Sequence, residues 1–446
     1  MTTRQVPPAG YNVAILVGAR PTSHPPNPRL TMFAFFSDSP EYLERKKTDF
    51  SPPQVTLADL HAVVPKELYK KSTSKGLYYV ARDISVSIAL YLATRRIDAV
   101  LQLLARSLSI NQVVLRIAGY ALWTAYWWFQ GLAFAGWWCL GHEAGHGTLS
   151  DYRLVNHVVG FTLHTLLLVP YYSWRSTHRA HHKATGSIER DENYVPRTRA
   201  QYSLPPPEKS RVTDYNEIFE ETPLYTLGRM LLMQAFGWHA YLMYNALGSP
   251  SYPEGTNHFS PSSMLFKPHE RSGVIASNIG LSAMAGVLFW CSRFMGAGDV
   301  CKLYIIPYLL ANNWIVLLTF LHHSDPTIPH YRSKEWSFVR GAIATVDRPL
   351  LGWAGRFFLH NVSHDHVAHH LFSTIPFYNQ PQVTECIKRV LKDDYNYDST
   401  NTFRALYRSF TECCFIEDEG DIVFYKNKDG VAQRRVCLDW TAKAEM

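Results

Sequence analysis

The strongest candidate span in the sequence covers residues 117–140, where 24 consecutive positions carry no charged side chain and five are tryptophan. The hydrocarbon core of a bilayer is about 30 Å thick and needs about 20 residues of helix to cross it. Residues 274–292 and 303–324 are also uncharged, and the short link between them predicts a helical hairpin. Residues 84–94 can cross the bilayer only if the charged side chains that flank them reach the two membrane–water interfaces. These patterns predict an all-α integral membrane protein with about four transmembrane helices, further interfacial helices and a cytosolic helical cap.

The composition agrees with a membrane protein and argues against several other classes. Hydrophobic residues make up 47% of the 446 residues and charged residues only 18%, which is not the composition of a disordered chain. The formal charge of +7 is too small and too scattered for a nucleic-acid-binding protein, and it suits contact with anionic membrane lipids better. The seven cysteines form no Cys-x-x-Cys pair, so a disulfide framework is not expected.

Histidine is the residue type that points to a function. Twenty are present, and most fall within residues 142–182 and 322–370. Residues 142–146 read His-Glu-Ala-Gly-His, and residues 178–182 and 366–370 both have the pattern His-x-x-His-His. On a helix, positions i, i+3 and i+4 lie on one face, so each of these boxes can direct its imidazoles toward shared metal ions. The eight predicted metal ligands are His142, His146, His178, His181, His182, His366, His369 and His370.

Zinc is one metal that this pattern allows. The first box matches the zinc-protease signature, in which His142 and His146 bind zinc and Glu143 acts as general base. The extended form of that signature continues with Gly and His, where this chain has Leu149 and Tyr152. Catalytic zinc takes three protein ligands, which would leave five box histidines unexplained.

Two iron ions are the alternative, because eight neutral imidazoles suit iron and leave open positions for dioxygen. Glu143 then holds a ligand ring in place, and Asp365 beside His366 is expected to do the same.

A shared cluster requires all three boxes on one side of the membrane, so an even number of crossings must separate them. Residues 154–174 are therefore expected to lie at the interface or to re-enter without crossing, and residues 230–248 to lie at the interface.

The ends of the chain differ from its middle. Residues 1–55 contain nine prolines and are expected to form a disordered tail. Residues 56–395 are expected to form the membrane-embedded unit, and residues 396–446 a cytosolic tail with a helix and a hairpin. Residues 381–391 predict a helix with proline in its first turn. The hairpin is expected within residues 422–436, around Asn-Lys-Asp-Gly.

The boxes and their surroundings resemble the membrane fatty acid desaturases, specifically the Δ12 (oleate) acyl-lipid group. The resemblance covers most of the chain from about residue 56, so residues 56–395 correspond to the desaturase domain. One departure is Ala144, where many members of the family carry cysteine, but this is not a metal position. The matching stretches are HEAGHGTLSDYRLVN (142–156), LLVPYYSWRSTHRAHHKATGSIERDENYVPR (167–197), TFLHHSDPTIPHY (319–331), EWSFVRGAIATVDR (335–348) and HVAHHLFSTIPFY (366–378).

The resemblance implies a di-iron centre held by the eight box histidines and one more ligand from the helix before the third box. His323 is the expected ninth ligand and His322 the alternative, whereas His360 and His364 are expected not to bind metal. It also implies dioxygen as co-substrate and an oleoyl chain, carried by a lipid or by coenzyme A, as substrate. A separate cytochrome b5 and its reductase would supply electrons, because the sequence has no flavin or nicotinamide fingerprint and no His-Pro-Gly-Gly motif. The implied location is the endoplasmic reticulum membrane, with the boxes and both termini in the cytosol.

Several outcomes remain open on the same scaffold. Hydroxylation, formation of a triple bond or an epoxide, and Δ15 (omega-3) desaturation all need only small shifts of the acyl chain relative to the metals. A membrane zinc protease is the remote alternative from another enzyme class, and a non-enzymatic membrane scaffold with a structural metal is the third.

Overall fold

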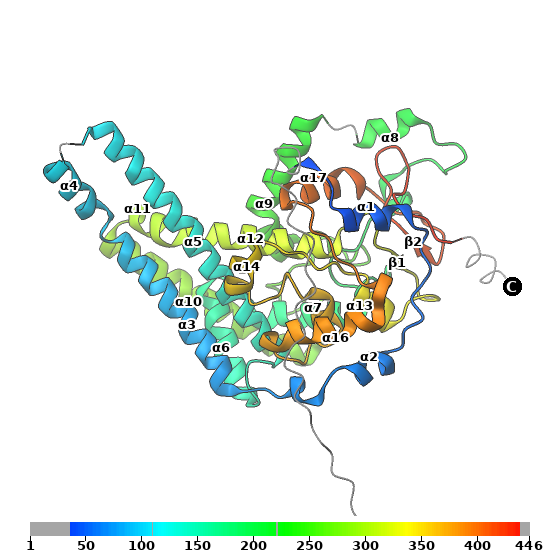
Figure 1. Ribbon diagram of the computed structural model, residues 1–446, viewed down its shortest axis with the longest axis horizontal. Coiled ribbons are helices and arrows are strands. Elements are labelled where there is room, and N and C mark those ends of the chain that lie inside the picture. The colour runs from blue at the N-terminus through cyan, green and yellow to red at the C-terminus, as the bar shows by residue number, and fades with distance from the viewer. Residues whose placement is uncertain (1–35, 109, 220–221, 438–446) are drawn as a thin grey trace, which may run out of the picture.

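The computed structural model describes residues 36–437 except 109 and 220–221, and this part of the chain is mostly helical (Figure 1). Its two short strands, β1 (His330–Tyr331) and β2 (Ile422–Val423), pair antiparallel. The α-helices are α1 (Pro40–Lys47), α2 (Leu57–Val63), α3 (Thr73–Thr94), α4 (Ile97–Leu108), α5 (Gln112–His146), α6 (Arg153–Leu166), α7 (Tyr171–Ala184), α8 (Val212–Phe219), α9 (Pro223–Tyr244), α10 (Arg271–Met295), α11 (Ala297–Val300), α12 (Ile306–His323), α13 (Phe338–Ile343), α14 (Gly352–Phe358), α15 (His366–Leu371), α16 (Gln380–Leu391) and α17 (Thr402–Glu412).

Helices α3, α4 and α5 form a long arm at one side of the molecule (Figure 1). Helix α5 contains the uncharged stretch 117–140 and has 35 residues, so it is about 50 Å long and exceeds the thickness of a bilayer core. The side chain of Asn111 caps its start by accepting from the backbone N–H of Val113 at 2.8 Å. Inside the body, α5 packs against α12, and the largest group of buried apolar side chains lies around these two helices and α9.

Two segments are long and apolar enough to cross a membrane, Pro268–Met295 and Ala297–His323. They contain the two stretches that predict a helical hairpin, and only Gly296 separates them. Helices α6 and α7 meet the same criterion only as a pair, and this pair is bent by 109°. A bend of this size occurs both in a broken span and in a re-entrant pair, so the expectation that residues 154–174 do not cross stays a prediction.

The stretch at residues 84–94 belongs to a longer helix than its apolar run suggested. Helix α3 begins at Thr73, so Arg82 and Asp83 lie near its middle and not at its end. Asp83 is buried, accepts a hydrogen bond from His360 Nε2 at 2.6 Å and forms an ion pair with Arg82 at 2.6 Å. Neither α3 nor α5 is among the candidate spans in the described part of the chain, so the count of about four transmembrane helices stays a prediction.

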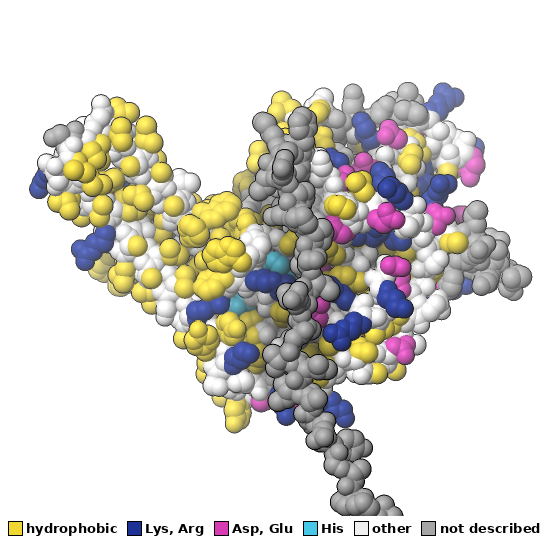
Figure 2. Space-filling model, in the orientation of Figure 1, with side chains coloured by type: hydrophobic (Ala, Val, Ile, Leu, Met, Phe, Trp, Pro, Cys, Tyr) yellow, Lys and Arg dark blue, Asp and Glu magenta, His cyan; other side chains and the backbone are white. Residues whose placement is uncertain are grey.

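Apolar and charged side chains gather on different parts of the molecule. Figure 2 shows that hydrophobic side chains dominate the arm formed by α3, α4 and α5, whereas charged side chains are concentrated over the opposite half, around α1, α16 and α17. Such a division is the one expected of a protein whose arm lies in lipid and whose opposite half faces water.

The expectation of disorder is wrong for the second part of the N-terminal segment, while residues 1–35 lie outside the described residues. Ser39 caps helix α1 by accepting from the backbone N–H of Tyr42, which is buried. Asp38 forms ion pairs with Arg404 and Arg408 of α17, at 2.9 and 2.8 Å. Long-range pairing of this kind cannot be seen in a proline-rich sequence, and it fixes residues 36–50 to the body of the protein.

The C-terminal segment also packs into the body. Helix α16 forms as predicted, with Pro381 in its first turn. The predicted hairpin is correct only at its tip, where Lys426 and Ala432 form an antiparallel bridge. Strand β2 pairs instead with β1, so the segment that precedes the turn is bound to the chain just after α12.

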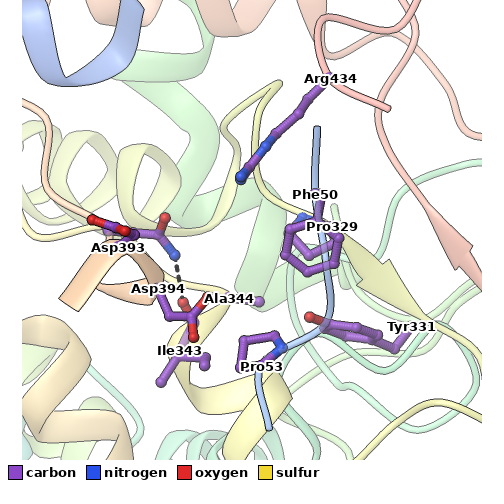
Figure 3. A pocket seen from close by; sticks show the side chains of 10 residues that line it. Phe50, Pro53, Pro329, Tyr331, Ile343, Ala344, Asp393, Asp394 and Arg434 are labelled. Atoms are coloured by element: carbon purple, nitrogen blue, oxygen red, sulfur yellow. Dashed lines mark hydrogen bonds between the residues drawn. The ribbon is translucent and has the colours of Figure 1, made fainter. Parts of the chain in front are cut away.

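A small pocket lies beside β1 (Figure 3). Its volume of about 20 Å³ is enough for roughly one water molecule, and no box histidine lines it.

A buried network of charges joins α17 to the end of α12. Arg348 forms ion pairs with Asp325 at 2.9 Å and Asp398 at 2.6 Å, and its Nε donates to the backbone carbonyl of Leu321 at 2.9 Å. Arg408 of α17 also pairs with Asp398, at 2.5 Å. The network therefore holds the backbone directly before and after His322 and His323.

Candidate metal centre

The first histidine box lies in the last turns of α5. Gly147 follows His146 directly and ends the helix with a φ of 76°. This left-handed conformation favours glycine because glycine has no Cβ. His142 and His146 therefore lie one helical turn apart, where the helix stops.

The other boxes reach this helix end on separate helices. The second box lies on α7, the third occupies most of α15, and α12 ends at His323. Asp347 accepts from the backbone N–H of Val367 at 2.8 Å and so holds the first turn of α15. The four helices together bring the nine predicted ligands to one region.

Five of the nine rings form one group, which we call the first histidine cluster: His142, His146, His178, His182 and His369. One nitrogen of each ring lies within 4.8 Å of one nitrogen of every other ring. Nε2 of His146 is 3.3 Å from Nε2 of His142 and 3.0 Å from Nε2 of His178. Two imidazole nitrogens that bind one ion at about 2.1 Å and roughly at right angles stand about 3.0 Å apart, so these separations fit a shared metal.

The other four rings form a second group. His181, His323 and His370 meet the same distance criterion among themselves. His366 adjoins them, with its Nε2 at 3.1 Å from Nε2 of His323 and at 3.1 Å from Nε2 of His370. We call these four residues the second histidine cluster. All four are buried.

Each cluster has one buried carboxylate hydrogen-bonded to one of its rings. In the first, Nδ1 of His142 donates to Glu143 at 3.1 Å, which is the contact that the sequence predicted for Glu143. In the second, Nδ1 of His181 donates to Asp191 at 2.6 Å. Such bonds fix the orientation of a ring and make its other nitrogen a stronger metal ligand.

Asp365 has different partners from those predicted. Its carboxylate pairs with Arg356 at 2.8 Å, and only its backbone carbonyl faces the box, where it accepts from the N–H of His369 at 2.9 Å. In the part of the chain that the structure describes, Asp191 is therefore the aspartate that holds a box ring, and Asp365 is not.

The rings of the third box are neutral at physiological pH. Burial lowers the pKa of His369 to about 3, and burial together with neighbouring histidines lowers the pKa values of His366 and His370 well below the ordinary value. A histidine binds a metal only in its neutral form, so these three rings lose no proton when they coordinate.

The two histidines that end α12 have different surroundings. His323 belongs to the second cluster, whereas Nδ1 of His322 donates to the backbone carbonyl of Val346 at 2.5 Å. The ring of His322 stacks on that of His366, with centroids 4.1 Å apart. His323 therefore lies among the rings of the second cluster, as expected of the ninth predicted ligand, and His322 packs behind His366. His360 and His364, which were expected not to bind metal, belong to neither group.

The residues present fit two metal ions. The donors are neutral imidazoles, a set that suits iron and other borderline transition metals better than calcium or magnesium. Nε2 of His369 is buried and has no hydrogen-bond partner among the described atoms. A buried nitrogen without a partner is costly unless something else binds its lone pair, and a metal in the first cluster would do so.

A cavity of about 1070 Å³ reaches both clusters. This volume lies at the upper end of the range of ligand pockets, about 300–1,000 Å³. Helices α9 and α12 supply much of its wall. Histidines of both clusters and two tryptophans of α5 and α7 line its inner part: His142, His178, His181, His323, His366, Trp138 and Trp174.

Three residues at the site carried no signal in the sequence. Asp191 follows the second box in an irregular loop, and neither helical spacing nor a motif connects it to His181. Thr185 lies 3.1 Å from Nδ1 of His370 through its hydroxyl. Tyr194 stacks on His323, with the ring planes 8° apart, and donates its hydroxyl to Thr319 at 2.6 Å. Its φ of 57° is unusual for a large side chain and marks a strained backbone.

The geometry does not fit the zinc-protease reading of the first box. In that reading Glu143 must be free to activate a water beside the metal. Instead one oxygen of Glu143 accepts from His142 and the other accepts from Thr148 at 2.6 Å, and the residue is 1% exposed. His142 and His146 also share their cluster with three further rings, which a zinc site would not use.

Comparison with known proteins gives a consistent result. The family model described as "Fatty acid desaturase" matches residues 121–401, which is more than half of the chain. The chain is 41% identical over 383 residues to a Δ12 fatty acid desaturase of Mortierella isabellina, covering 85% of this chain and 92% of that protein.

More distant relatives include two kinds of enzyme. A Δ12 fatty acid desaturase of Arabidopsis thaliana is 36% identical over 389 residues, covering 86% of this chain and 94% of that protein. An oleate hydroxylase of Claviceps purpurea is 34% identical over 417 residues, covering 87% of this chain and 84% of that protein.

Proposed function

The chain belongs to the fatty acid desaturase family, and from this premise we propose that it is a Δ12 desaturase that converts oleoyl chains to linoleoyl chains. Each turnover removes two hydrogens from neighbouring CH₂ groups and forms one cis double bond. Dioxygen takes up these two hydrogens with two electrons and two protons from outside, so two water molecules are the other product. The observation that carries the proposal is the pair of histidine clusters at the inner wall of one large cavity.

The nine histidines of the two clusters would hold two iron ions. When bound, the irons supply the oxidation of an unactivated C–H bond by dioxygen, which no side-chain acid or base can perform. Glu143 and Asp191 hold one ring of each cluster, and their negative charges balance part of the charge of the metals.

The cavity would orient the acyl chain. Trp138 stacks on His142, with centroids 5.6 Å apart, and Trp174 stacks on His178, with centroids 4.5 Å apart. Both tryptophans line the cavity beside these rings, so they place apolar surface directly against the clusters and exclude water from them. A chain held in one position presents only one pair of CH₂ groups to the metals.

The setting of the enzyme follows from the same proposal. The protein would lie in the endoplasmic reticulum membrane with about four spans, with the boxes and both termini in the cytosol. Cytochrome b5 and its reductase would deliver the electrons. The acyl chain would be carried by a membrane lipid or by coenzyme A.

The second candidate is hydroxylation of the same chain. Relatives named as oleate hydroxylases, which are 34% and 36% identical to this chain, favour it. Desaturation and hydroxylation begin on the same C–H bond, so the position of the chain relative to the metals decides between them.

Expression in yeast microsomes supplied with oleoyl substrate, followed by mass spectrometry of the fatty acids, tests the proposal. Linoleate is the expected product, and a count of about two irons per purified chain is expected with it. A 12-hydroxy product would replace the desaturase by the hydroxylase, and a double bond at carbon 15 would change the regiospecificity. A protein that binds two irons yet gives no oxidised product with reductant and oxygen would overturn the proposal.

A further inference from the structure

The exposed face of α7 carries a row of basic side chains. Arg175, Arg179 and Lys183 are spaced by four residues, so they lie along one side of the helix. Arg179 and Lys183 are exposed and Arg175 is partly exposed. The histidines of the second box lie on an adjoining face of the same helix, so this row borders the candidate metal centre.

Arg153, at the start of α6, is a further exposed basic residue close to this row. Its Nε lies 3.3 Å from Nε2 of His157, and the His157 ring packs against Tyr172 in the first turn of α7, with centroids 5.7 Å apart. We call Arg153, Arg175, Arg179 and Lys183 the basic row. In the described part of the chain, no acidic side chain forms an ion pair with any of these four residues.

The basic row lies beside His146, a box histidine that is partly exposed although it does not line the substrate cavity. His146 and His178 are the two partly exposed rings of the first cluster. His178 lines the cavity, but His146 does not. Arg175 packs against the residue before His146, because its Nε donates to the carbonyl of Gly145 at 2.9 Å. The partly exposed side of His146 is therefore bordered by the basic row.

The neighbouring surface indicates what this face meets. Helix α6 exposes Leu154 and Val158, at 74% and 55%, as expected of a helix in contact with lipid. No large hydrophobic side chain of α7 is exposed to a similar extent. The basic row therefore lies on a polar surface next to the lipid-facing one, where a water-soluble domain can approach.

We propose that the basic row is the docking surface for an acidic electron-carrier protein, and that electrons enter the metal centre through His146. The inference rests on the proposed function, because the reaction requires a reductant. The carrier is oxidised by one electron in each docking event, and two events supply the two electrons that reduce dioxygen together with the hydrogens of the substrate. Unpaired cations around an exposed ligand ring attract an acidic partner and place it over the shortest route to the centre.

The test uses the full chain in nanodiscs of neutral phosphatidylcholine and the soluble haem domain of cytochrome b5 as the probe. Arg179→Glu/Lys183→Glu should weaken binding of the probe by roughly tenfold or more and flatten its dependence on salt. The control, Lys46→Glu/Lys428→Glu, makes the same change of charge at exposed lysines of α1 and of the C-terminal segment and should leave binding within about twofold.

Further measurements separate a docking defect from other failures. Iron content, and product formed with a chemical reductant that bypasses docking, should match the unmodified protein in both variants. Absence of that product from every protein would contradict the proposed function rather than the docking surface. Equal binding of the probe by the two variants would overturn the docking proposal. If the Arg179→Glu/Lys183→Glu variant bound the probe as tightly as the control in neutral nanodiscs and differed from it only in nanodiscs that contain phosphatidylserine, the basic row would be a lipid contact and the proposal would be wrong.

Discussion

In the first histidine cluster two of the five rings, His146 and His178, are partly exposed, whereas all four rings of the second cluster are buried. The first cluster stands on the end of one long helix and is completed by α7 and α15. The second is enclosed from several sides. Asp191 holds His181, Tyr194 stacks on His323, and the network around Arg348 fixes the end of α12.

This difference separates two tasks within one centre. The cavity reaches both clusters, so the substrate can meet either of them. Only the first cluster has a ring, His146, that is exposed away from the cavity, which makes it the side for electron entry. The second cluster has no such opening, and its surroundings keep its rings in place. The comparison predicts that changes near the second cluster act through the geometry of its rings and change metal binding before they change substrate binding.

The largest effect is expected from removal of a ring of the second cluster. His323→Gln should lower product formation below detection and reduce the iron content from about two to about one per chain, because the buried cluster cannot replace a lost ligand by a side chain from solvent. Metal analysis of the purified protein measures this directly.

His322→Gln is the matched control for that change. Its amide can still donate to the carbonyl of Val346, and its position behind His366 predicts an iron content near that of the unmodified protein. Equal loss of iron from the two variants would show that the two histidines have the same role, which contradicts the distinction between them.

The next largest effect concerns the buried charges that hold the end of α12. Arg348→Met leaves Asp325 and Asp398 in a buried site without one of their partners, which typically costs about 3–5 kcal/mol. A clear fall in Tm is expected, with iron lost from the second cluster at a lower temperature than from the first. Thermal unfolding in detergent, followed together with metal release, measures both.

An exposed ion pair provides the comparison for Arg348. Lys334 and Asp421 form a pair at 3.0 Å with side chains that are 60% and 38% exposed, and an ion pair so open to water contributes little to stability. Lys334→Met should therefore shift Tm by little. A fall as large as that of Arg348→Met would mean that the buried network has no special role.

A smaller effect is expected at Asp191. Asp191→Asn removes the negative charge from the partner of His181 while it keeps the size of the side chain. Loss of such a partner typically weakens metal binding by about 10–100-fold, and here the loss should affect one of the two irons. Titration of the metal-free protein with Fe²⁺ should resolve one weakened and one unchanged site.

Asp365→Asn is the control for that titration. Its carboxylate pairs with Arg356 and not with a box ring, so both sites should keep their affinity. If Asp365→Asn weakened iron binding and Asp191→Asn did not, the sequence-based assignment of Asp365 would be correct and the structural one wrong.

Local spacing explains why so much of the site could be predicted from the sequence. The three boxes place their rings by helix geometry alone, and the structure brings all eight of these histidines together with His323. The uncharged stretches likewise predicted the two candidate spans Pro268–Met295 and Ala297–His323, because about 20 apolar residues in one run are a local property.

Contacts between distant segments account for what the sequence did not predict. Asp83 pairs with His360, 277 positions away, so α3 continues through a charge that suggested its end. Asp38 pairs with Arg404, 366 positions away, so a proline-rich segment is fixed to the body. Asp191 and Tyr194 reach the second cluster through an irregular loop, and no spacing rule describes such a path.

The smallest effect is expected at Tyr194, and it tests whether ring stacking or hydrogen bonding holds His323. Tyr194→Phe keeps the stacked ring but removes the bond to Thr319, which is worth about 0.5–1.5 kcal/mol net. Product formation should fall by no more than roughly tenfold, and both irons should remain. Tyr194→Leu removes the stack as well and should weaken the second iron site further, because the flat ring that packs against His323 is then lost. The ratio of the two effects, measured by Fe²⁺ titration and by the spectroscopic signature of the bound iron, identifies which of the two contacts holds the His323 ring.

Equal behaviour of the two variants would show that the aromatic face of Tyr194 has no influence on the His323 ring. The enclosure of the second cluster would then depend on Asp191 and the charged network alone.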